Sequence, residues 1–523
     1  MKRLAFALLP LDDRPPNLQF PRRLAAVGGI SLRLPPKRLL GRYLRPGDCE
    51  GVWQWLEEAA RDADGVVVSC DMLAYGGLVA SRTTRVSAEN AASRAARLRE
   101  LRRRFPQLRI HAFAVIPRLG VTVSSPELAK LGPMLARYHE LLHRPTPDQR
   151  QGDELARLVA ELQPQIIAEH DAMRRRNLEV NKTLVALAGE DVVDFLVFAQ
   201  EDAPPTGPHV AEQKELVAEG QARGVTHRMR IYPGADETGI ALMARAAAEA
   251  VGANPTVYPL CGTPGGTECV ALFEDRPLGL TIGGQIEGIG LEVSETEEDA
   301  DIVLAFHAPH LPKQTDINCV IEASAPDPEF VKHLAEVART GKAVALADVA
   351  YCNGADPALV SALAAEKTLP HLAAFAAWNT AGNTIGTALA QAALRWVGRG
   401  IRSRAGRSSA AAERAHIEFL FERLVDDYGY QTVVRPDAYR FVRETLGEWP
   451  LNLRRGRRGA AEYVRGRLEP LARQLFAEHF EGEEVDGRSI AALRGLKIKL
   501  PWPRLFEVEV EARVALACII HTR

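Results

Sequence analysis

The stretch Phe195-Leu-Val-Phe-Ala-Gln-Glu-Asp-Ala-Pro-Pro-Thr-Gly207 decides the fold expected of this chain. Its first five residues are apolar, and they run directly into Gln200, Glu201 and Asp202 before a Pro-Pro turn. A short apolar run is typical of a buried parallel strand, and α/β folds carry their chemistry at the carboxyl ends of such strands. The stretch therefore predicts two neighbouring carboxylates at the edge of a site. Alternatively, Asp202 only begins a turn or caps the next helix.

The same unit, an apolar strand with a polar end followed by a helix, recurs along the first 400 residues. The strand candidates are 4–11, 65–70, 109–116, 195–200, 229–232, 256–260, 301–306, 343–347 and 372–377. Alternating strands and helices predict a parallel α/β fold with right-handed crossovers. An eight-stranded (β/α)8 TIM-like barrel is the preferred interpretation, with the strand near Val257 outside it. The alternative is a separate doubly wound domain over residues 250–400.

Two further segments flank or interrupt this pattern. Residues 126–187 have helical spacing and predict a long helical insertion, which could be a lid or a dimer face. Residues 400–412 are small, basic and serine-containing, and so predict a linker. We therefore expect a catalytic barrel over 1–399 and a C-terminal, mainly helical accessory domain over 400–523. The accessory domain ends in strand-like runs of alternating polarity.

The composition is that of a soluble globular protein. Hydrophobic residues make up 46% and charged residues 25% of the chain, and the formal net charge is −2. These values predict no nucleic-acid partner, and no apolar run is long enough to predict a membrane span. Seven scattered cysteines without a CxxC motif predict neither a disulfide framework nor a zinc knuckle, which fits the cytoplasm. The apolar N-terminus meets Asp12 and Asp13 at once, so we interpret it as a first strand.

Several strand ends carry carboxylates, arginine, asparagine or aromatic residues, and parallel strands bring such ends to one face. Directed donors and acceptors suit hydroxyl groups, and aromatic rings stack on sugar rings, so a small saccharide is the expected substrate. Core packing is the alternative explanation for the aromatic residues. Thr263-Pro-Gly-Gly266 lacks the lysine of a phosphate-binding loop, and no cofactor is expected. The candidate binding residues are Asp12, Asp13, Arg14, Asp71, Tyr75, Tyr232, Asp236, Glu237, Trp378, Asn379 and Asn383.

The adjacent carboxyls Glu201 and Asp202 favour one variant of glycoside hydrolysis. Neighbouring residues at a strand end point in different directions, so they cannot easily flank a sugar ring as nucleophile and acid. They suit substrate assistance, in which the substrate's acetamido oxygen attacks the anomeric carbon. One carboxylate then polarises the amide while the other protonates the leaving group.

Four motifs resemble a bacterial family known only as a domain of unknown function, and the similarity spans nearly the whole chain. The motifs are Pro10-Leu-Asp-Asp-Arg-Pro-Pro-Asn17, the stretch from Asp71 to Arg82, Gly234-Ala-Asp-Glu237 and Trp378-Asn-Thr-Ala-Gly-Asn383. More distantly, Gln200-Glu201-Asp202 resembles the acidic pair of barrel-type β-N-acetylhexosaminidases. That resemblance implies that Glu201 polarises the acetamido group and Asp202 is the acid. It also implies that Arg14 or Asp13 holds distal hydroxyls and that Trp378 and Asn379 close the pocket. The order Glu-Asp departs from the usual Asp-Glu or Asp-Asp.

The expected function is thus an exo-acting, retaining β-N-acetylhexosaminidase, with N-acetylgalactosaminides as one possible substrate class and a homodimer as one possible assembly. A metal-dependent hydrolase is a first alternative, with Asp12, Asp71, Asp236, His307 and His310 as ligands, although no HExxH or HxH motif supports it. A non-catalytic carbohydrate-binding protein is the second.

Overall fold

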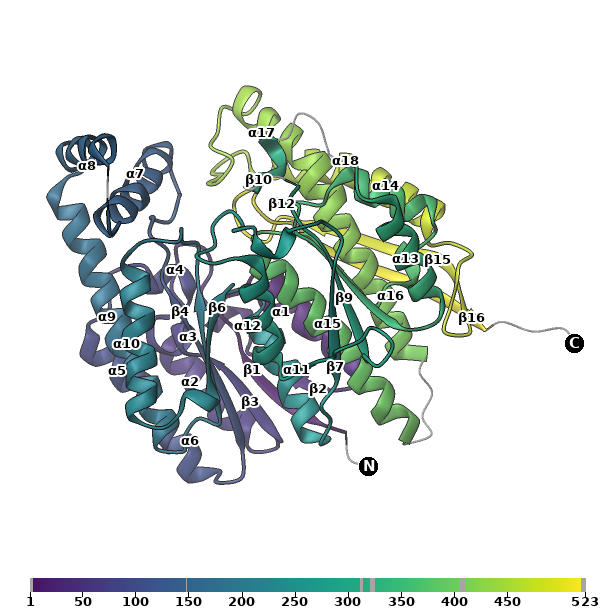
Figure 1. Cartoon of the computed structure of the whole chain (residues 1–523), viewed down its shortest axis with the longest axis horizontal. Coiled ribbons are helices and arrows are strands. Elements are labelled where there is room, and N and C mark those ends of the chain that lie inside the picture. The colour runs from purple at the N-terminus through teal and green to yellow at the C-terminus, as the bar shows by residue number, and fades with distance from the viewer. Residues whose placement is uncertain (1–2, 147, 311–313, 320–324, 405–409, 519–523) are drawn as a thin grey trace, which may run out of the picture.

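A computed structural model describes residues 3–146, 148–310, 314–319, 325–404 and 410–518. Two parallel sheets lie side by side, each covered by helices, and a long antiparallel hairpin lies against the second half of the molecule (Figure 1). The chain completes the first sheet before it begins the second.

The first sheet contains six parallel strands in the order β2-β1-β3-β4-β5-β6. In chain order they are β1 (Ala5–Leu9), β2 (Ser31–Arg33), β3 (Gly65–Ser69), β4 (Arg109–Ile116), β5 (Phe195–Gln200) and β6 (Met229–Pro233). One face is covered by α1 (Pro15–Gly28) and α11 (Thr238–Ala250), and the other by α2 (Cys49–Ala60), α5 (Ala88–Ala96) and α9 (Pro164–Gly189). Burial on both faces explains why the inner strands are continuous apolar runs.

The second sheet contains five parallel strands in the order β13-β11-β9-β7-β8. They are β7 (Thr256–Cys261), β8 (Glu292–Val293), β9 (Ile302–His307), β11 (Ala343–Asp348) and β13 (Ala374–Ala376). The helices that pack around them include α12 (Leu278–Ile289), α13 (Pro328–Arg339), α14 (Pro357–Ala365) and α15 (Ala381–Arg404). Counted within the sheet, the order is 2-1-3-4-5, which the first five strands of the other sheet also follow. This is the doubly wound order of flavodoxin-like folds.

The expected α/β fold with parallel strands is confirmed, but the described strands form two open sheets instead of one closed TIM-like barrel. The strand near Val257 is the first strand of the second sheet. The alternative of a separate doubly wound unit over residues 250–400 matches this arrangement. Each sheet ends at unpaired edge strands because β2 and β6, like β8 and β13, have a parallel neighbour on one side only.

The predicted helical insertion is present as α7 (Pro126–Leu142), α8 (Gln149–Glu161) and the N-terminal half of α9. Figure 1 shows α7 and α8 standing beyond the carboxyl ends of the first sheet, while α17 (Arg435–Glu444) stands beyond the second. No helix in the described ranges is both long enough and apolar enough to cross a lipid bilayer.

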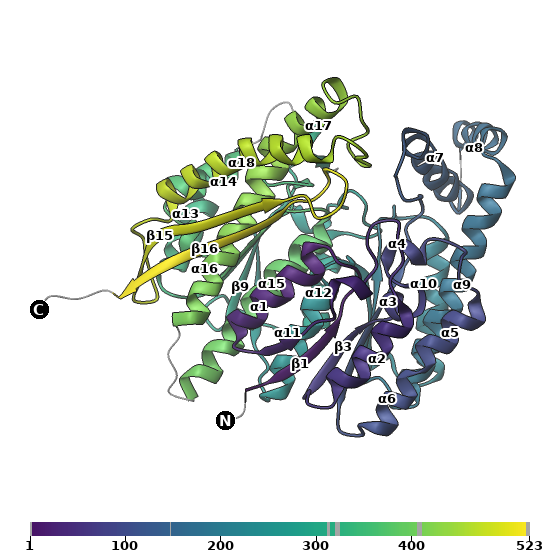
Figure 2. The ribbon, with the colours of Figure 1, turned by 180° about the vertical axis from the view of Figure 1, so that it is seen from behind.

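The C-terminal segment is partly helical and partly β-sheet. It includes α16 (Ala410–Leu424), a π-helical stretch over Val425–Val434, α17, α18 (Arg457–His479) and the hairpin β15 (Arg488–Lys499) and β16 (Glu509–Cys518). Figure 2 shows the hairpin beside α16 and α1. Arg23 of α1 joins both, because it donates to Glu418 of α16 at 2.8 Å and to the Ala512 carbonyl of β16 at 2.9 Å. Of the predicted linker, residues 400–404 continue α15, while 405–409 lie outside the described residues.

Candidate functional site

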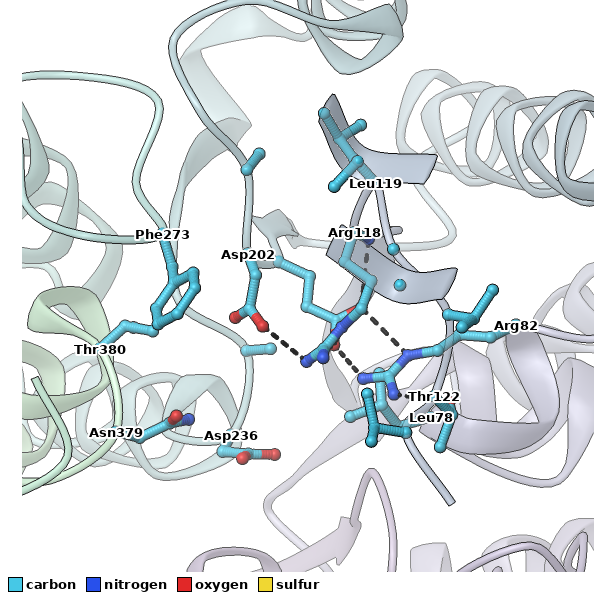
Figure 3. A pocket seen from close by; sticks show the side chains of 18 of the residues that line it. Leu78, Arg82, Arg118, Leu119, Thr122, Asp202, Asp236, Phe273, Asn379 and Thr380 are labelled. Atoms are coloured by element: carbon cyan, nitrogen blue, oxygen red, sulfur yellow. Dashed lines mark hydrogen bonds and ion pairs between the residues drawn. The ribbon is translucent and has the colours of Figure 1, made fainter. Parts of the chain in front are cut away.

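A cavity of about 590 Å³ lies between the carboxyl ends of the two sheets. Such volumes are typical of small-molecule sites. Its wall combines loops that follow five strands of the first sheet with the segment after β13 and part of the C-terminal segment. Figure 3 shows part of this wall, with Arg118 and Asp202 from the first sheet and Asn379 from the second. Of the predicted residues, Arg14, Glu201, Asp202, Asp236, Asn379 and Asn383 line it. The expectation that distant strand ends meet at one cavity therefore holds for these six.

Both carboxylate oxygens of Glu201 accept hydrogen bonds from two arginines. Arg118 donates from Nε to Oε1 at 2.8 Å and from its backbone N–H to Oε2 at 3.2 Å. Arg82 donates from Nε to Oε2 at 3.2 Å and also contacts Oε1. Burial alone would raise the pKa of Glu201, but the two guanidinium groups lower it to about 2. Glu201 is therefore an ionised anchor that holds Arg82 and Arg118 in the wall.

Asp202 projects from the same loop into the cavity. Its side chain is 28% exposed, against 4% for Glu201, and its Oδ2 lies 2.8 Å from Nη2 of Arg118. Burial raises the pKa of Asp202 above its usual value, while Arg118 opposes the shift. Figure 3 shows its carboxylate facing the side chain of Phe273 on one side and Arg118 on the other. A carboxyl with a raised pKa and partial exposure has the properties of a proton donor.

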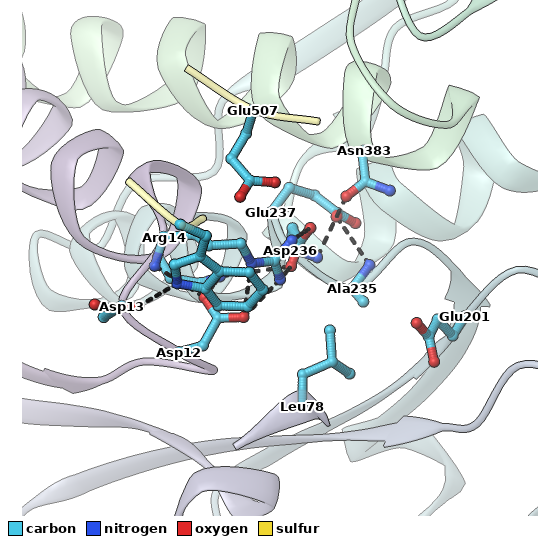
Figure 4. A network of polar contacts seen from close by, with 12 residues as sticks. Asp12, Asp13, Arg14, Leu78, Glu201, Ala235, Asp236, Glu237, Asn383 and Glu507 are labelled. Atoms are coloured by element: carbon cyan, nitrogen blue, oxygen red, sulfur yellow. Dashed lines mark hydrogen bonds and ion pairs between the residues drawn. The ribbon is translucent and has the colours of Figure 1, made fainter. Parts of the chain in front are cut away.

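A second carboxylate, Asp236, lies on another part of the wall. Arg14 donates from Nη1 to its Oδ2 at 2.9 Å and also contacts Oδ1. The same guanidinium donates to Asp12 (Figure 4). Its centre lies 5.0 Å from the ring centroid of Trp502. Burial raises the pKa of Asp236, and the positive charge of Arg14 opposes this effect. Asp236, which follows the last strand of the first sheet, is thus held in place by a residue that follows the first strand.

The second sheet contributes the segment that joins β13 to α15. Asn379, at φ 54°, lies in this segment and Asn383 lies in the first turn of α15, and both line the cavity. Asn383 accepts the backbone N–H of Asp236 at 3.3 Å, so the two sheets meet at this contact. The approach requires glycine at position 382, because a Cβ atom would lie 2.3 Å from the Pro233 carbonyl oxygen. Two amide side chains are thereby fixed opposite the acidic loops.

Gln285 of α12 joins the end of β6 to the first turn of α15. Its Nε2 donates to the carbonyls of Pro233 and Gly382, both at 3.1 Å, and to Glu237 at 2.8 Å. Pro233 ends the first sheet and Gly382 follows the second. This bridge fixes the relative position of the two halves of the cavity wall.

Phe273 is the exposed aromatic residue of the cavity. Its side chain is among the large hydrophobics that remain accessible, at 44% exposure. Its backbone carbonyl accepts the N–H of Ala203 at 3.0 Å, which ties the loop after β7 to the loop that carries Asp202. Figure 3 places its ring between Asp202 and Thr380. An accessible ring beside carboxylates and amides could stack on a ring-shaped ligand.

Four predicted polar residues lie behind the wall. Asp12 supports Arg14, and Asp13 accepts from the indole of Trp502 at 2.6 Å. Asp71 accepts the Val115 N–H at 2.9 Å, and Glu237 is fully buried on Gln285. Burial raises the pKa of both Asp71 and Glu237 to about 7. These residues position neighbouring segments and do not face the cavity.

The three predicted aromatic residues are buried. Tyr232 is wholly inaccessible beneath α12, and Tyr75 lies under the guanidinium of Arg176, 4.3 Å from its centroid. Trp378 packs edge-on against Phe20 at 5.7 Å between centroids. The alternative of core packing therefore describes their surroundings better than contact with a ligand.

Other lining residues were absent from the predicted set. Arg82, Arg118 and Phe273 are examples, as are Trp502 and Arg504 from the loop between β15 and β16. Arg82 and Arg118 follow strands β3 and β4, so the rule that selected Arg14 would have found them. Nothing in the sequence links the segment at Trp502 to the first strand, because that contact depends on how the C-terminal segment folds back.

The five residues proposed as ligands of a catalytic metal do not form a metal-binding group among the described residues. His307, at the end of β9, lies 3.3 Å from Asp348 and is not part of the cavity wall. A different group of histidines, in the helical insertion, is considered below.

This chain belongs to the family described as "Protein of unknown function (DUF4127)", which matches residues 6–511. No curated protein and no solved structure matches it. The predicted membership of a family of unknown function is confirmed, and no comparison supports the distant resemblance to β-N-acetylhexosaminidases.

Proposed function

We propose that this member of the DUF4127 family is a glycoside hydrolase that acts on a small saccharide in the cavity between its two sheets. One observation carries the proposal. Asp202, a partly exposed carboxyl, shares a cavity with a second carboxyl, Asp236, and each is oriented by its own arginine. Two carboxyls around one bond are the usual requirement of glycoside hydrolysis.

The charge balance of the wall favours a neutral ligand over an anionic one. Arg82 and Arg118 are paired with Glu201 and Asp202, and Arg14 with Asp236. Since these arginines are already neutralised, little positive charge is left for a phosphate group. Amide groups and an accessible ring complete a wall that suits hydroxyls and a sugar face.

In the proposed reaction, Asp202 donates its proton to the glycosidic oxygen as the bond from that oxygen to the anomeric carbon breaks. A water molecule forms the new bond to the anomeric carbon, and Asp236 accepts the proton that the water loses. Burial raises the pKa of both Asp202 and Asp236, and an arginine opposes the shift at each. The proposal assigns the base to Asp236 because Arg14 contacts both of its oxygens, and the acid to Asp202 because its side chain is the more exposed.

In a second form of the proposal, the acetamido oxygen of the substrate attacks the anomeric carbon before water does. This form assigns the polarising role to Glu201, whose two oxygens already accept hydrogen bonds from Arg82 and Arg118. Asp236, which is held by one arginine instead of two, is therefore the candidate for the second carboxylate. N-acetylhexosaminides remain the substrates to test first.

A panel of nitrophenyl glycosides, each supplied with and without a 2-acetamido group, tests both forms. Release of nitrophenol from any member supports the hydrolase, and strict dependence on the 2-acetamido group supports substrate assistance. Calorimetric titration with the free sugars runs in parallel. Binding without turnover on every glycoside would favour a carbohydrate-binding protein. The absence of both binding and turnover would contradict the proposal that the ligand is a saccharide.

A further inference from the structure

A group of metal-binding side chains lies between α7 and α9, within the helical insertion. It consists of His139 from α7 and His170 and Asp171 from α9. One potential ligand atom from each residue lies within 4.8 Å of the others. Within the described ranges, no other group of three or more such residues meets this criterion.

The two histidines are buried without hydrogen-bond partners. His139 is 1% exposed and His170 is 7% exposed, and their rings lie 4.8 Å apart. Neither nitrogen of either ring makes a hydrogen bond to a described residue, although the backbone of Arg118 approaches His170. Buried polar atoms are normally satisfied, so unpaired ring nitrogens on two neighbouring buried histidines call for a ligand.

An imidazole binds a metal ion through the lone pair of one ring nitrogen. The nearby cation Arg174 is paired with Glu212 at 2.7 and 2.8 Å, which limits its repulsion of a divalent ion.

We propose that His139, His170 and Asp171 bind one Zn²⁺ ion that links α7 to α9. Two imidazoles and a carboxylate are ordinary zinc ligands, and three protein ligands leave one position for water. Zinc–ligand distances of about 2.1 Å place neighbouring ligand atoms about 3.4 Å apart in a tetrahedron. His139 Nε2 and Asp171 Oδ1 are already 3.8 Å apart, so small side-chain rotations close the site.

The site would order one wall of the cavity. Arg137 and Glu140, on either side of His139 in the sequence, line the cavity. The backbone of Arg118 approaches His170, and the side chain of Arg118 pairs with Asp202. Metal-binding histidines commonly direct their second nitrogen at a backbone carbonyl. The proposal is independent of the saccharide reaction, because none of the three ligands lines the cavity.

The test uses the full-length protein without a histidine tag, first treated with a chelator and then dialysed against ZnSO₄. We expect one zinc per chain by mass spectrometry of the metal content and a rise in melting temperature on zinc addition. Co²⁺ in its place should give the visible absorption of a tetrahedral site. Zinc retention below 0.2 per chain, or equal retention of zinc by wild type and the ligand variants, would overturn the proposal.

The variants are His170→Ala and Asp171→Asn, and His143→Ala is the matched control. His143 is an exposed histidine one turn from His139, with its Nδ1 2.9 Å from the His139 carbonyl oxygen. We expect each ligand variant to weaken zinc binding by at least about tenfold. Removing a residue that only hydrogen-bonds to a metal ligand already lowers the affinity for the metal by about that factor. The control should bind as the wild type does. Asp171, with a 41% exposed side chain, keeps the test valid if His170→Ala fails to fold. Equal loss in His143→Ala would assign the zinc to surface histidines, and tighter anaerobic retention of Fe²⁺ than of Zn²⁺ would overturn the choice of metal.

Discussion

Arg14 and Asp236 form a two-pronged ion pair although 222 positions separate them, with Nη1 of Arg14 2.9 Å from Oδ2 of Asp236. Their strands, β1 and β6, are not neighbours in the sheet. The contact forms because α1 and α11, which begin just after these residues, lie on the same face of the sheet. The packing of two helices thus fixes the orientation of a carboxylate in the cavity.

Replacing Asp202 by Asn should lower turnover by about 10²–10⁴-fold, because an amide cannot donate the proton that the leaving group needs. The loss should be smallest for glycosides whose leaving group is already a weak base. Steady-state rates on nitrophenyl and dinitrophenyl glycosides measure both effects. Glu140→Gln, which changes another cavity-lining carboxylate, is the control and should keep most of the activity. Equal losses on good and poor leaving groups would remove Asp202 as the acid.

Replacing Glu201 by Gln should destabilise the fold by about 3–5 kcal/mol, because Arg82 loses the buried carboxylate it pairs with and Arg118 keeps only Asp202. Urea unfolding at pH 7 measures this free energy. The control is Glu190→Gln, whose exposed pair with Arg99 should contribute less than about 1 kcal/mol. A Glu201→Gln protein as stable as the control would show that Glu201 is not the anchor of the two arginines.

Glu237 should make the stability depend on pH in a definite direction. Burial raises its pKa from 4.5 to about 7, so between these values the folded state binds more protons than the unfolded state. Stability from this group is therefore complete below pH 4.5 and falls as the pH rises to 7, by up to about 3 kcal/mol.

Glu237→Gln should remove this dependence of the free energy of unfolding on pH, because the amide can still form hydrogen bonds to its neighbours but does not ionise. Urea midpoints at pH 5 and pH 8 for wild type and variant give the comparison. The variant should gain stability relative to wild type at pH 8, with little difference between them at pH 5. The same relative stability at both pH values would contradict the raised pKa.

Gly288→Ala should destabilise the interface between α12 and β6. A Cβ atom at this position would lie 2.6 Å from Cε1 of Tyr232, whose ring is wholly buried and cannot move aside freely. Overpacking of this kind typically costs about 1–3 kcal/mol. Gly283→Ala is the control, because nothing lies within 4 Å of a Cβ atom there. Thermal melting of the two variants should separate them, and an unchanged melting temperature in Gly288→Ala would mean that the interface adjusts.

The strands, the helical insertion and six members of the cavity wall could be predicted from the sequence, because each depends on a local pattern of apolar runs and polar strand ends. The choice between a barrel and two sheets could not. The same alternation of strand and helix fits both, and the decision depends on which strands pair. The short edge strands β2 and β8 were missed because their side chains are half-buried or exposed and form no apolar run.

The roles of individual polar residues were harder to predict than their position. Asp71 and Asp202 both follow apolar strands, yet Asp71 is sealed against the Val115 backbone while Asp202 faces the cavity. A strand end identifies the correct edge of the sheet, but the direction of each side chain there depends on the loop. The contribution of Trp502 depends on a contact between the first and last parts of the chain, which no local pattern encodes.

The bridge made by Gln285 has a consequence for how a substrate enters. Its one amide nitrogen contacts the last residue of β6 and the first turn of α15, so hinge motion of the two halves would break both contacts together. We therefore expect the cavity to be preformed, and we do not expect the two halves of the molecule to close around the substrate.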